Sequence, residues 1–237
     1  MDCKVLRTYK NFDRRSLDII SEVTDIIEAH ELFEHTFFKD YDARRLPEAC
    51  ERKWLKQRHF LSKNFPSVYG NIISNSTDLE FLRPFIRQLW EEAGSGKQED
   101  THYYLLLNTL FAKGITTLEI DREPISPGTQ RVISAYRKWT SHENVIVGGA
   151  IFGLGIEPII AMDKELSLKG LRKNNTLSEQ ELFYFISHAS HDYRHSWQIL
   201  DAVLPHVKDG KEVGLIKEGV IDLLDSRVKF YDNCLSI

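Results

Sequence analysis

The sequence predicts an all-α protein, folded as a single-domain helical bundle that spans residues 1–237. Two observations favour this class. Apolar residues recur at three- and four-residue steps through most of the chain, which is the period of an amphipathic helix. Only the segment NVIVGGAIFGLGIEPIIA could form strands, and no other segment offers it a partner strand. A bundle of about seven to nine helices is therefore expected.

Helix boundaries follow from turn-forming residues and from caps. Breaks fall at SNSTD, AGSGKQED, REPISPG, KNNTLSE and PHVKDGKE, where residues that favour turns gather. Ser16 suits the N-cap of the first helix, and Ser178 with Glu181 forms a capping-box pattern. The helices are expected at residues 16–38, 47–63, 66–75, 78–92, 102–113, 128–141, 143–168, 178–204 and 211–233.

Charge and composition indicate which partners and which cellular location to expect. The 237 residues carry a formal net charge of −4, with no block of Lys or Arg. Neither nucleic acid nor an anionic membrane is therefore expected as a partner. The opening MDCKVLRTYKNFDRR has no apolar signal region, and no run approaches the roughly 20 apolar residues of a membrane-spanning helix. We expect a cytoplasmic protein.

The cysteines, Cys3, Cys50 and Cys234, lie far apart in the sequence. Three cysteines at such spacings make neither a disulfide framework nor a CxxC metal clip. None lies beside a candidate base, so they are expected to be reduced structural thiols rather than nucleophiles.

The segment FISHASHDYRHSWQIL carries an unusual set of polar rings. On a helix, His188, Asp192 and His195 lie within roughly 60° of one another on one face. Two imidazoles and a carboxylate suit iron, manganese or zinc. His191 is rotated to the flank of this face. The alternative is an ordinary polar network, so the motif predicts a metal only if other helices supply further ligands.

Two other segments offer such ligands. Glu91 and Glu92 end one expected helix, and His102 opens the next after a glycine-rich turn, so an antiparallel pair can bring Glu92 and His102 to one level of the bundle. Glu157 lies in an otherwise apolar helix, where burying an unpaired carboxylate is costly. Pro158 lacks an N–H group for the carbonyl of Leu154, which locally weakens that helix.

Together these residues resemble the haem-oxygenase-like di-iron oxidases and oxygenases, which share their fold with thiaminase-II and pyrroloquinoline-quinone-synthase proteins. The resemblance covers roughly residues 28–205 and includes EHTFF at 34–38 and KNFP at 63–66. It implies two Fe(II) ions as cofactors and O₂ as co-substrate. The residues that match the family's metal ligands, in order, are Glu92, His102, Glu157, His188, Asp192 and His195.

The resemblance also implies a reaction. It predicts oxidation of a small amine or amino acid, and the similarity to nitrile-forming members implies conversion of a dibrominated L-tryptophan to an indole-3-carbonitrile. Glu92 and Glu157 are expected to be the catalytic, bridging carboxylates. One iron is expected to bind His102 with His195, and the other His188 with Asp192. A homodimer is expected, with an external electron donor as a further partner.

Three departures limit what the resemblance implies. Some N-oxygenating members have an additional Glu on the second helix, but the matching stretch here falls near Pro66, so six ligands are expected. A chlamydial relative that makes para-aminobenzoate consumes its own tyrosine after HTF, and Phe38 stands at that place here. Thiaminase members use an active-site cysteine, and no cysteine here matches it.

The substrate pocket is less defined by the sequence. Phe152 and Gly153 precede Glu157 by about a turn, and His59 lies on the second helix, so these three are candidates to line the pocket. A basic side chain should meet a substrate carboxylate. Candidates for that contact are Arg58, Lys63 and Lys208.

Other functions remain as alternatives. The same metal centre could serve an N-oxygenase, or an enzyme that oxidatively cleaves C–C bonds in another amino acid or a fatty acid. His30 and His35 could instead hold a haem beneath the glycine-rich segment GGAIFGLG. A metal-free helical scaffold would leave the histidine cluster as a polar network.

Overall fold

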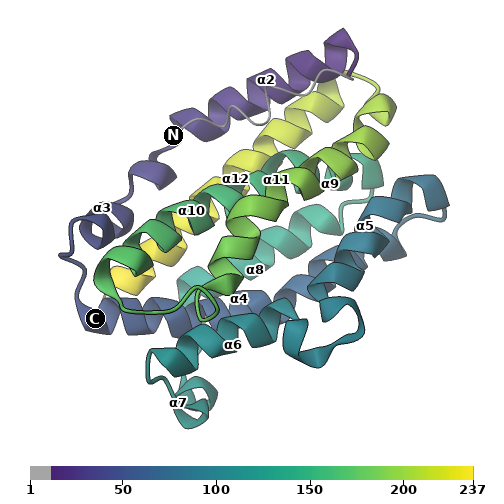
Figure 1. The fold of residues 1–237 in the computed structure, drawn as a ribbon. Coiled ribbons are helices and arrows are strands. Elements are labelled where there is room, and N and C mark those ends of the chain that lie inside the picture. Colours follow the sequence, from purple (N-terminus) through teal and green to yellow (C-terminus); the bar gives the residue numbers. More distant parts are fainter. Residues whose placement is uncertain (1–11, 237) are drawn as a thin grey trace.

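The computed structural model describes residues 12–236, which contain helices and no strand (Figure 1). This confirms the all-α class, with one continuous apolar core. The α-helices are α2 (Arg14–Ala29), α3 (Thr36–Asp42), α4 (Glu48–Ser74), α5 (Leu79–Glu92), α6 (His102–Ala112), α7 (Thr117–Arg122), α8 (Pro127–Thr140), α9 (Val145–Ile151), α10 (Glu157–Asn174), α11 (Phe183–Val203) and α12 (Gly210–Leu235). Shorter helical turns are η1 (Glu31–Glu34), η2 (Gly94–Gly96), η3 (Gln98–Asp100), η4 (Phe152–Ile156) and η5 (Leu204–His206).

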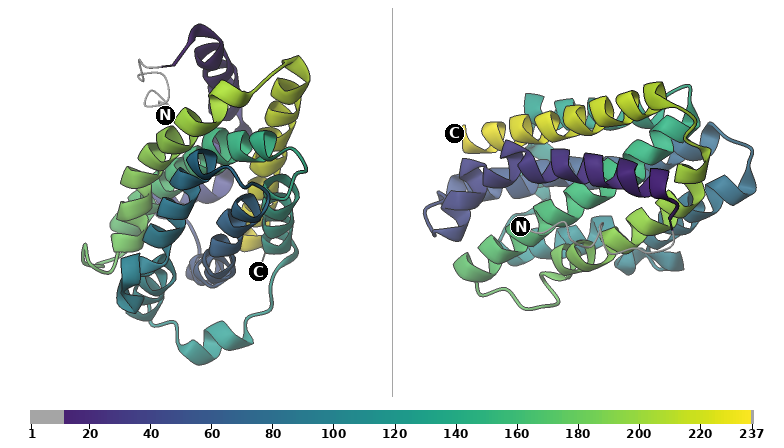
Figure 2. Two further views of the ribbon diagram at one scale, coloured as in Figure 1. Left: turned by 90° about the vertical axis from the view of Figure 1, so that its right-hand side faces the viewer. Right: turned by 90° about the horizontal axis from the view of Figure 1, so that it is seen from above.

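Helices α10 and α11 pack along each other in the body of the bundle. Helix α12 lies against α8 on one side and α2 on another, and α2 runs beside it at the edge of the molecule (Figures 1 and 2). Helices α5 and α6 both pack against α11. Side chains from α5, α6, α10 and α11 can therefore converge inside the bundle.

The first expected helix is broken in two places, so the continuous helix over 16–38 was wrong. Helix α2 begins at Arg14 with Asp13 as its cap, and Ser16 donates its backbone N–H to the Asp13 side chain. His30 and His35 have extended backbone angles. The Nδ1 atom of each accepts the backbone N–H two residues later, so each histidine caps the following helix.

Helix α4 is continuous through Pro66, where the sequence predicted a break between 63 and 66. Proline removes one helical hydrogen bond and normally kinks or ends a helix. Here Phe65 and Tyr69 lie one turn apart on a buried face, together with Val68 and Ile72. Burial of this apolar face outweighs the local cost of Pro66.

The expected helix over 143–168 contains an irregular turn where the sequence predicts weakness. Helix α9 passes into η4, a π-helical turn, and the N–H of Glu157 bonds to the carbonyl of Phe152, five residues earlier. Val145–Asn174 is, contrary to expectation, long and apolar enough to span a membrane. Since 89% of its apolar window is buried inside the protein, a core helix accounts for it.

The segment before α11 forms the capping box that the sequence predicts. Ser178 and Glu181 exchange side-chain and backbone hydrogen bonds as a capping box, although the regular helix begins at Phe183. The short helix α7 was not expected. Cys50 and Cys234 are buried free thiols, as predicted, whereas Cys3 lies outside the described residues.

Candidate metal centre

Helix α11 presents His188, Asp192 and His195 to the interior of the bundle. All three side chains are buried, at 5%, 2% and 5% exposure. Tyr193 and Trp197 are rotated away into the apolar core, as their positions predict. His191 is exposed, and its Nδ1 atom lies within hydrogen-bond distance of the Ser187 hydroxyl.

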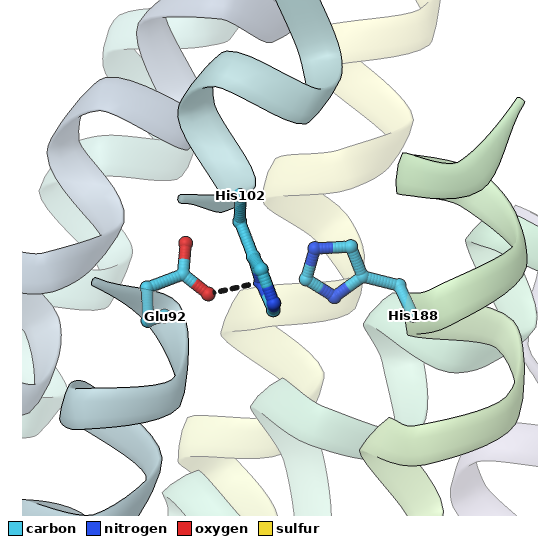
Figure 3. Close-up of side chains that lie close together, drawn as sticks. All are labelled: Glu92, His102 and His188. Carbon is cyan, nitrogen blue, oxygen red and sulfur yellow. Dashed lines mark ion pairs between the residues drawn. The ribbon is translucent and has the colours of Figure 1, made fainter. Parts of the chain in front are cut away.

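A first group of side chains that could bind a metal ion joins three helices. Glu92 ends α5, His102 opens α6, and His188 faces both from α11 (Figure 3). One ligand atom from each lies within 4.8 Å of the others. Glu92 and His102 form an ion pair through Oε2 and Nδ1. The predicted antiparallel pairing of these two residues is therefore present.

The turn between Glu92 and His102 depends on glycine. Gly94 and Gly96 have φ angles of 77° and 94°, a left-handed conformation that other residues rarely adopt. A Cβ atom on Gly94 would lie 2.6 Å from the backbone nitrogen of Thr101. Thr101 in turn caps α6, so this tight loop sets where His102 begins its helix.

A second group consists of Glu157, Asp192 and His195, whose ligand atoms also lie within 4.8 Å of one another. Glu157 is the first residue of α10, directly after the π-helical turn. Its carboxylate accepts a hydrogen bond from the Tyr69 hydroxyl at 2.8 Å. His195 turns Nδ1 toward Asp192 and Glu157, at 3.8 and 4.0 Å.

The grouping differs from the expected one. We expected His102 with His195 and His188 with Asp192, but His102 lies with His188, and Asp192 with His195. The reason is that Glu92 and His102 reach α11 near its start, at His188, whereas Glu157 at the start of α10 reaches it nearer its middle. The two groups touch, since Nδ1 of His188 lies 3.0 Å from the Asp192 carboxylate.

Glu91 also contacts this site, which sequence reasoning did not assign. Its carboxylate lies 3.0 Å from Nε2 of His195 and also pairs with Arg87. Gln88, one turn earlier on α5, donates to the backbone carbonyl of His195 at 3.0 Å. The spacing of Gln88 and Glu91 on one helix face is the signal that could have indicated this contact.

Burial dominates the pKa values of the carboxylates in the second group. Burial raises the pKa of Glu157 well above its usual value, and the neighbouring Asp192 raises it further. Burial likewise raises the pKa of Asp192 to about 6, although His195 opposes this. Burial also lowers the pKa of His188 and His195, which favours their neutral, metal-binding form.

The first group behaves differently because its charges are paired. Burial opposes ionisation of both partners, but the His102 imidazolium lowers the pKa of Glu92, and Glu92 raises the pKa of His102. In the same group, the Nε2 atom of His188 is buried and has no hydrogen-bond partner among the described residues. A buried ring nitrogen of this kind is well suited to binding a cation.

These residues fit a pair of divalent first-row metal ions. Each group supplies imidazole nitrogen and carboxylate oxygen, the donor set that suits iron, manganese and zinc. His188 and His195 each turn one ring nitrogen to a carboxylate, at Asp192 and Glu91. That contact fixes the orientation of a metal-binding histidine.

A cavity adjoins the first group. Its volume is about 20 Å³, which is room for about one water molecule. Glu92 and His188 line one part of its wall, and Arg58, Lys164 and Arg227 line another. Lys63 and Lys208 are exposed, so of the three basic residues considered from the sequence only Arg58 reaches this cavity.

The expected pocket residues do not line this cavity. Phe152 packs among the rings of Tyr69 and Phe85. A Cβ atom on Gly153 would lie 2.8 Å from the Leu200 side chain, so this glycine permits close packing with α11. His59 is buried beside other aromatic rings. A substrate contact for Phe152, Gly153 or His59 stays a prediction.

The two histidines of the haem alternative are fully engaged in the fold. Nδ1 of His30 and of His35 accepts a backbone N–H at each cap. Nε2 of each lies 3.2 Å from an aspartate on α12, Asp225 for His30 and Asp232 for His35. Neither ring has a free nitrogen for an iron.

Several known proteins are similar to this chain. It is 24% identical over 183 residues to the 4-aminobenzoate synthase of Chlamydia trachomatis, covering 76% of this chain and 77% of that protein. It is 22% identical over 194 residues to the 4-aminobenzoate synthase of Chlamydia muridarum, with coverage of 81% and 80%.

Solved structures share the fold. A TenA homologue from Pseudomonas syringae has a TM-score of 0.75 at 14% identity, covering 98% of this chain and 96% of that one. A CADD-like protein of unknown function from Nostoc punctiforme has a TM-score of 0.73 at 14% identity, covering 94% and 95%. A domain with a haem-oxygenase-like fold from Shewanella denitrificans has a TM-score of 0.70 at 15% identity, covering 95% and 93%.

The chain also matches a protein family. Residues 52–220 match the sequence profile of a family described as iron-containing redox enzymes. This span is more than half of the 237-residue chain. The protein therefore belongs to this family of iron-containing redox enzymes and has its haem-oxygenase-like fold.

Proposed function

We propose that the protein is a non-haem di-iron oxidoreductase that uses O₂ to oxidise a small amino acid or amine. The observation that carries this proposal is the pair of adjoining ligand groups, Glu92–His102–His188 and Glu157–Asp192–His195. Two Fe(II) ions held there would supply electrons to O₂ and activate it. Membership of an iron-containing redox family supports iron over the other metals that suit these donors.

The residues of the chain hold and orient this centre. The Glu91 carboxylate contacts Nε2 of His195 and so fixes its ring from the side opposite to Asp192 and Glu157. Tyr69 donates to one oxygen of Glu157 and leaves the other free for a metal. Glu92 and Glu157, the two proposed catalytic carboxylates, are 6% and 1% exposed, so the surrounding helices exclude bulk water from the reacting atoms.

We propose an external substrate rather than a side chain of the protein itself. The related chlamydial proteins are named 4-aminobenzoate synthases, and a relative of that kind consumes a tyrosine where this chain has Phe38. Phe38 carries no hydroxyl group and is buried against the ring of Tyr231, 4.5 Å between centroids. This position supports chemistry on a bound molecule.

The specific reaction that we propose is conversion of a dibrominated L-tryptophan to an indole-3-carbonitrile. Its support is the resemblance of the chain to nitrile-forming family members, together with basic side chains beside the ligand groups. N-oxygenation or oxidative C–C cleavage of another amino acid or fatty acid would use the same centre. An external electron donor would be needed wherever the substrate does not supply all the electrons.

Anaerobic reconstitution with Fe(II) tests the proposal. We expect two irons per chain, and O₂ consumption that one substrate class accelerates. Incubation with 5,7-dibromo-L-tryptophan, L-tryptophan, tyramine and octanoate, followed by mass spectrometry, distinguishes the products. Iron binding below one ion per chain would overturn the di-iron assignment. Two irons without a nitrile product would overturn only the specific reaction.

A further inference from the structure

Lys164 lies on the same face of α10 as Glu157, two helical turns further along, which is about 10 Å on the helix axis. It is only 2% exposed and lines the cavity beside Glu92 and His188. The structure shows no hydrogen bond or ion pair to its amine from any residue within 12–236. Its Nζ atom lies over the face of the Tyr184 ring, 4.8 Å from the centroid.

The neighbouring cations, Arg58 and Arg227, do have hydrogen-bond partners. Arg58 donates to the Asp163 carboxylate at 2.9 Å and to the Tyr231 hydroxyl at 2.8 Å. Arg227 donates to the other oxygen of Asp163 at 2.6 Å. One carboxylate thus forms ion pairs with two buried guanidinium groups, whereas Lys164 has no such ion pair within residues 12–236.

This arrangement leaves an excess of positive charge in a buried wall. Within this wall Arg58, Arg227 and Lys164 stand against the single carboxylate of Asp163, with all four side chains at most 3% exposed. Burial together with the Arg58 charge lowers the pKa of Lys164 well below its usual value, although Asp163 and Asp192 oppose this. A buried amine that makes no hydrogen bond is costly to the fold, so its presence at a cavity points to a ligand that accepts one from it.

We infer that Lys164 is the anchor for a substrate carboxylate, with Arg58 and Arg227 as supporting cations in the same wall. This inference rests on the proposed function and specifies its substrate class: a molecule with a carboxylate at one end and the oxidised atoms at the other. The carboxylate would sit at the Lys164 wall. Because the cavity has room for about one water, its lining would have to move apart to admit the rest of the molecule toward Glu92 and His188. Amino acids and fatty acids meet this description, whereas simple amines do not.

The test compares carboxylates with their own carboxamides, which keep the shape and remove the charge. L-Tryptophan, L-tyrosine and octanoate, each beside its carboxamide, are titrated into the apo chain and into the chain loaded with redox-inactive Mn(II). Binding is measured by calorimetry and by the shift in melting temperature. At least one carboxylate should bind wild type tenfold or more tightly than its carboxamide.

Three variants assign the effect to Lys164. Lys164→Met removes the charge at similar volume and should abolish the discrimination, while Lys164→Arg should retain part of it. Lys208→Met removes an exposed lysine and should change nothing. In the absence of ligand, Lys164→Met should melt at the same temperature as wild type or higher, because it removes an unpaired buried amine. Lys164→Gln serves in its place if the Met variant does not fold.

The outcomes separate this inference from the proposed function. Equal binding of each carboxylate and its carboxamide, no carboxylate binding at all, or unchanged discrimination in Lys164→Met would overturn the inference. If the same wild-type preparation holds two irons, the di-iron proposal survives that result. Discrimination that depends on Lys164 in a chain that binds no iron would support the anchor and overturn the di-iron proposal.

Discussion

The Nε2 atom of His195 lies 3.0 Å from the carboxylate of Glu91, while Nδ1 of the same ring faces Asp192 and Glu157. A carboxylate behind a metal-binding histidine fixes its tautomer and makes the ring a better ligand. Glu91 is therefore a positioning residue for the second ligand group, although it is adjacent in sequence to Glu92, which belongs to the first.

Replacing Glu91 should weaken one metal selectively. We expect Glu91→Ala to lower the affinity for the second ion by about 10- to 100-fold, and Glu91→Gln to have a smaller effect because an amide oxygen still accepts the Nε2 proton. Mn(II) titration followed by electron paramagnetic resonance measures both sites. Glu80→Ala removes an exposed carboxylate of the same helix and is the control. Equal affinities in Glu91→Ala and wild type would contradict the positioning role.

Paired substitutions distinguish the two possible groupings of the ligands. His102→Ala with His188→Ala should leave the second group intact, so we expect about one metal per chain. His102→Ala with His195→Ala removes one ligand from each group, so both metals should be weakened. Metal analysis after dialysis measures the difference. The reverse pattern would instead favour the grouping of His102 with His195 that the sequence suggested.

Metal affinity should depend on pH through the carboxylates of the second group. Burial raises the pKa of Asp192 to about 6 and raises that of Glu157 well above its usual value. A metal must displace these protons, so affinity should fall as the pH drops from 7 to 5, by about tenfold per pH unit for each proton displaced. Mn(II) titrations at several pH values, with proton release followed by an indicator dye, measure this. Asp192→Asn should bind more weakly with a shallower dependence, and a flat wild-type profile would argue against proton competition.

Two glycines should respond oppositely to the same substitution. A Cβ atom on Gly170 would collide with the ring of Tyr41, whose hydroxyl donates to Glu51 at 2.5 Å. We expect Gly170→Ala to lower the free energy of unfolding by about 1–3 kcal/mol. Gly214 in α12 has open space around it, so Gly214→Ala should raise that free energy by about 0.5–1 kcal/mol. Urea denaturation compares the two, and equal effects would mean that helix propensity alone decides at both positions.

The helical class and most helix positions could be predicted from the sequence because they depend on local patterns. A local weakness of the helix around Glu157 was predicted in the same way, since Pro158 removes a specific donor, but its form, a π-helical turn, was not expected. The continuous helix through Pro66 was not, because its stability comes from packing of the face that carries Phe65 and Tyr69 against other helices. The break at His30 and His35 likewise depends on aspartates of α12, nearly 200 residues away.

For the site, the types of the candidate ligands and their approximate levels could be predicted from the sequence, because the spacing of His188, Asp192 and His195 places them on one helix face. The division of the six residues into two groups could not be predicted, since it depends on where α5, α6 and α10 meet α11. The tertiary structure also brought Glu91 behind His195 and placed Lys164 in a cavity wall with one carboxylate shared between two arginines. Such contacts join residues that no local pattern relates, so they follow from helix packing alone.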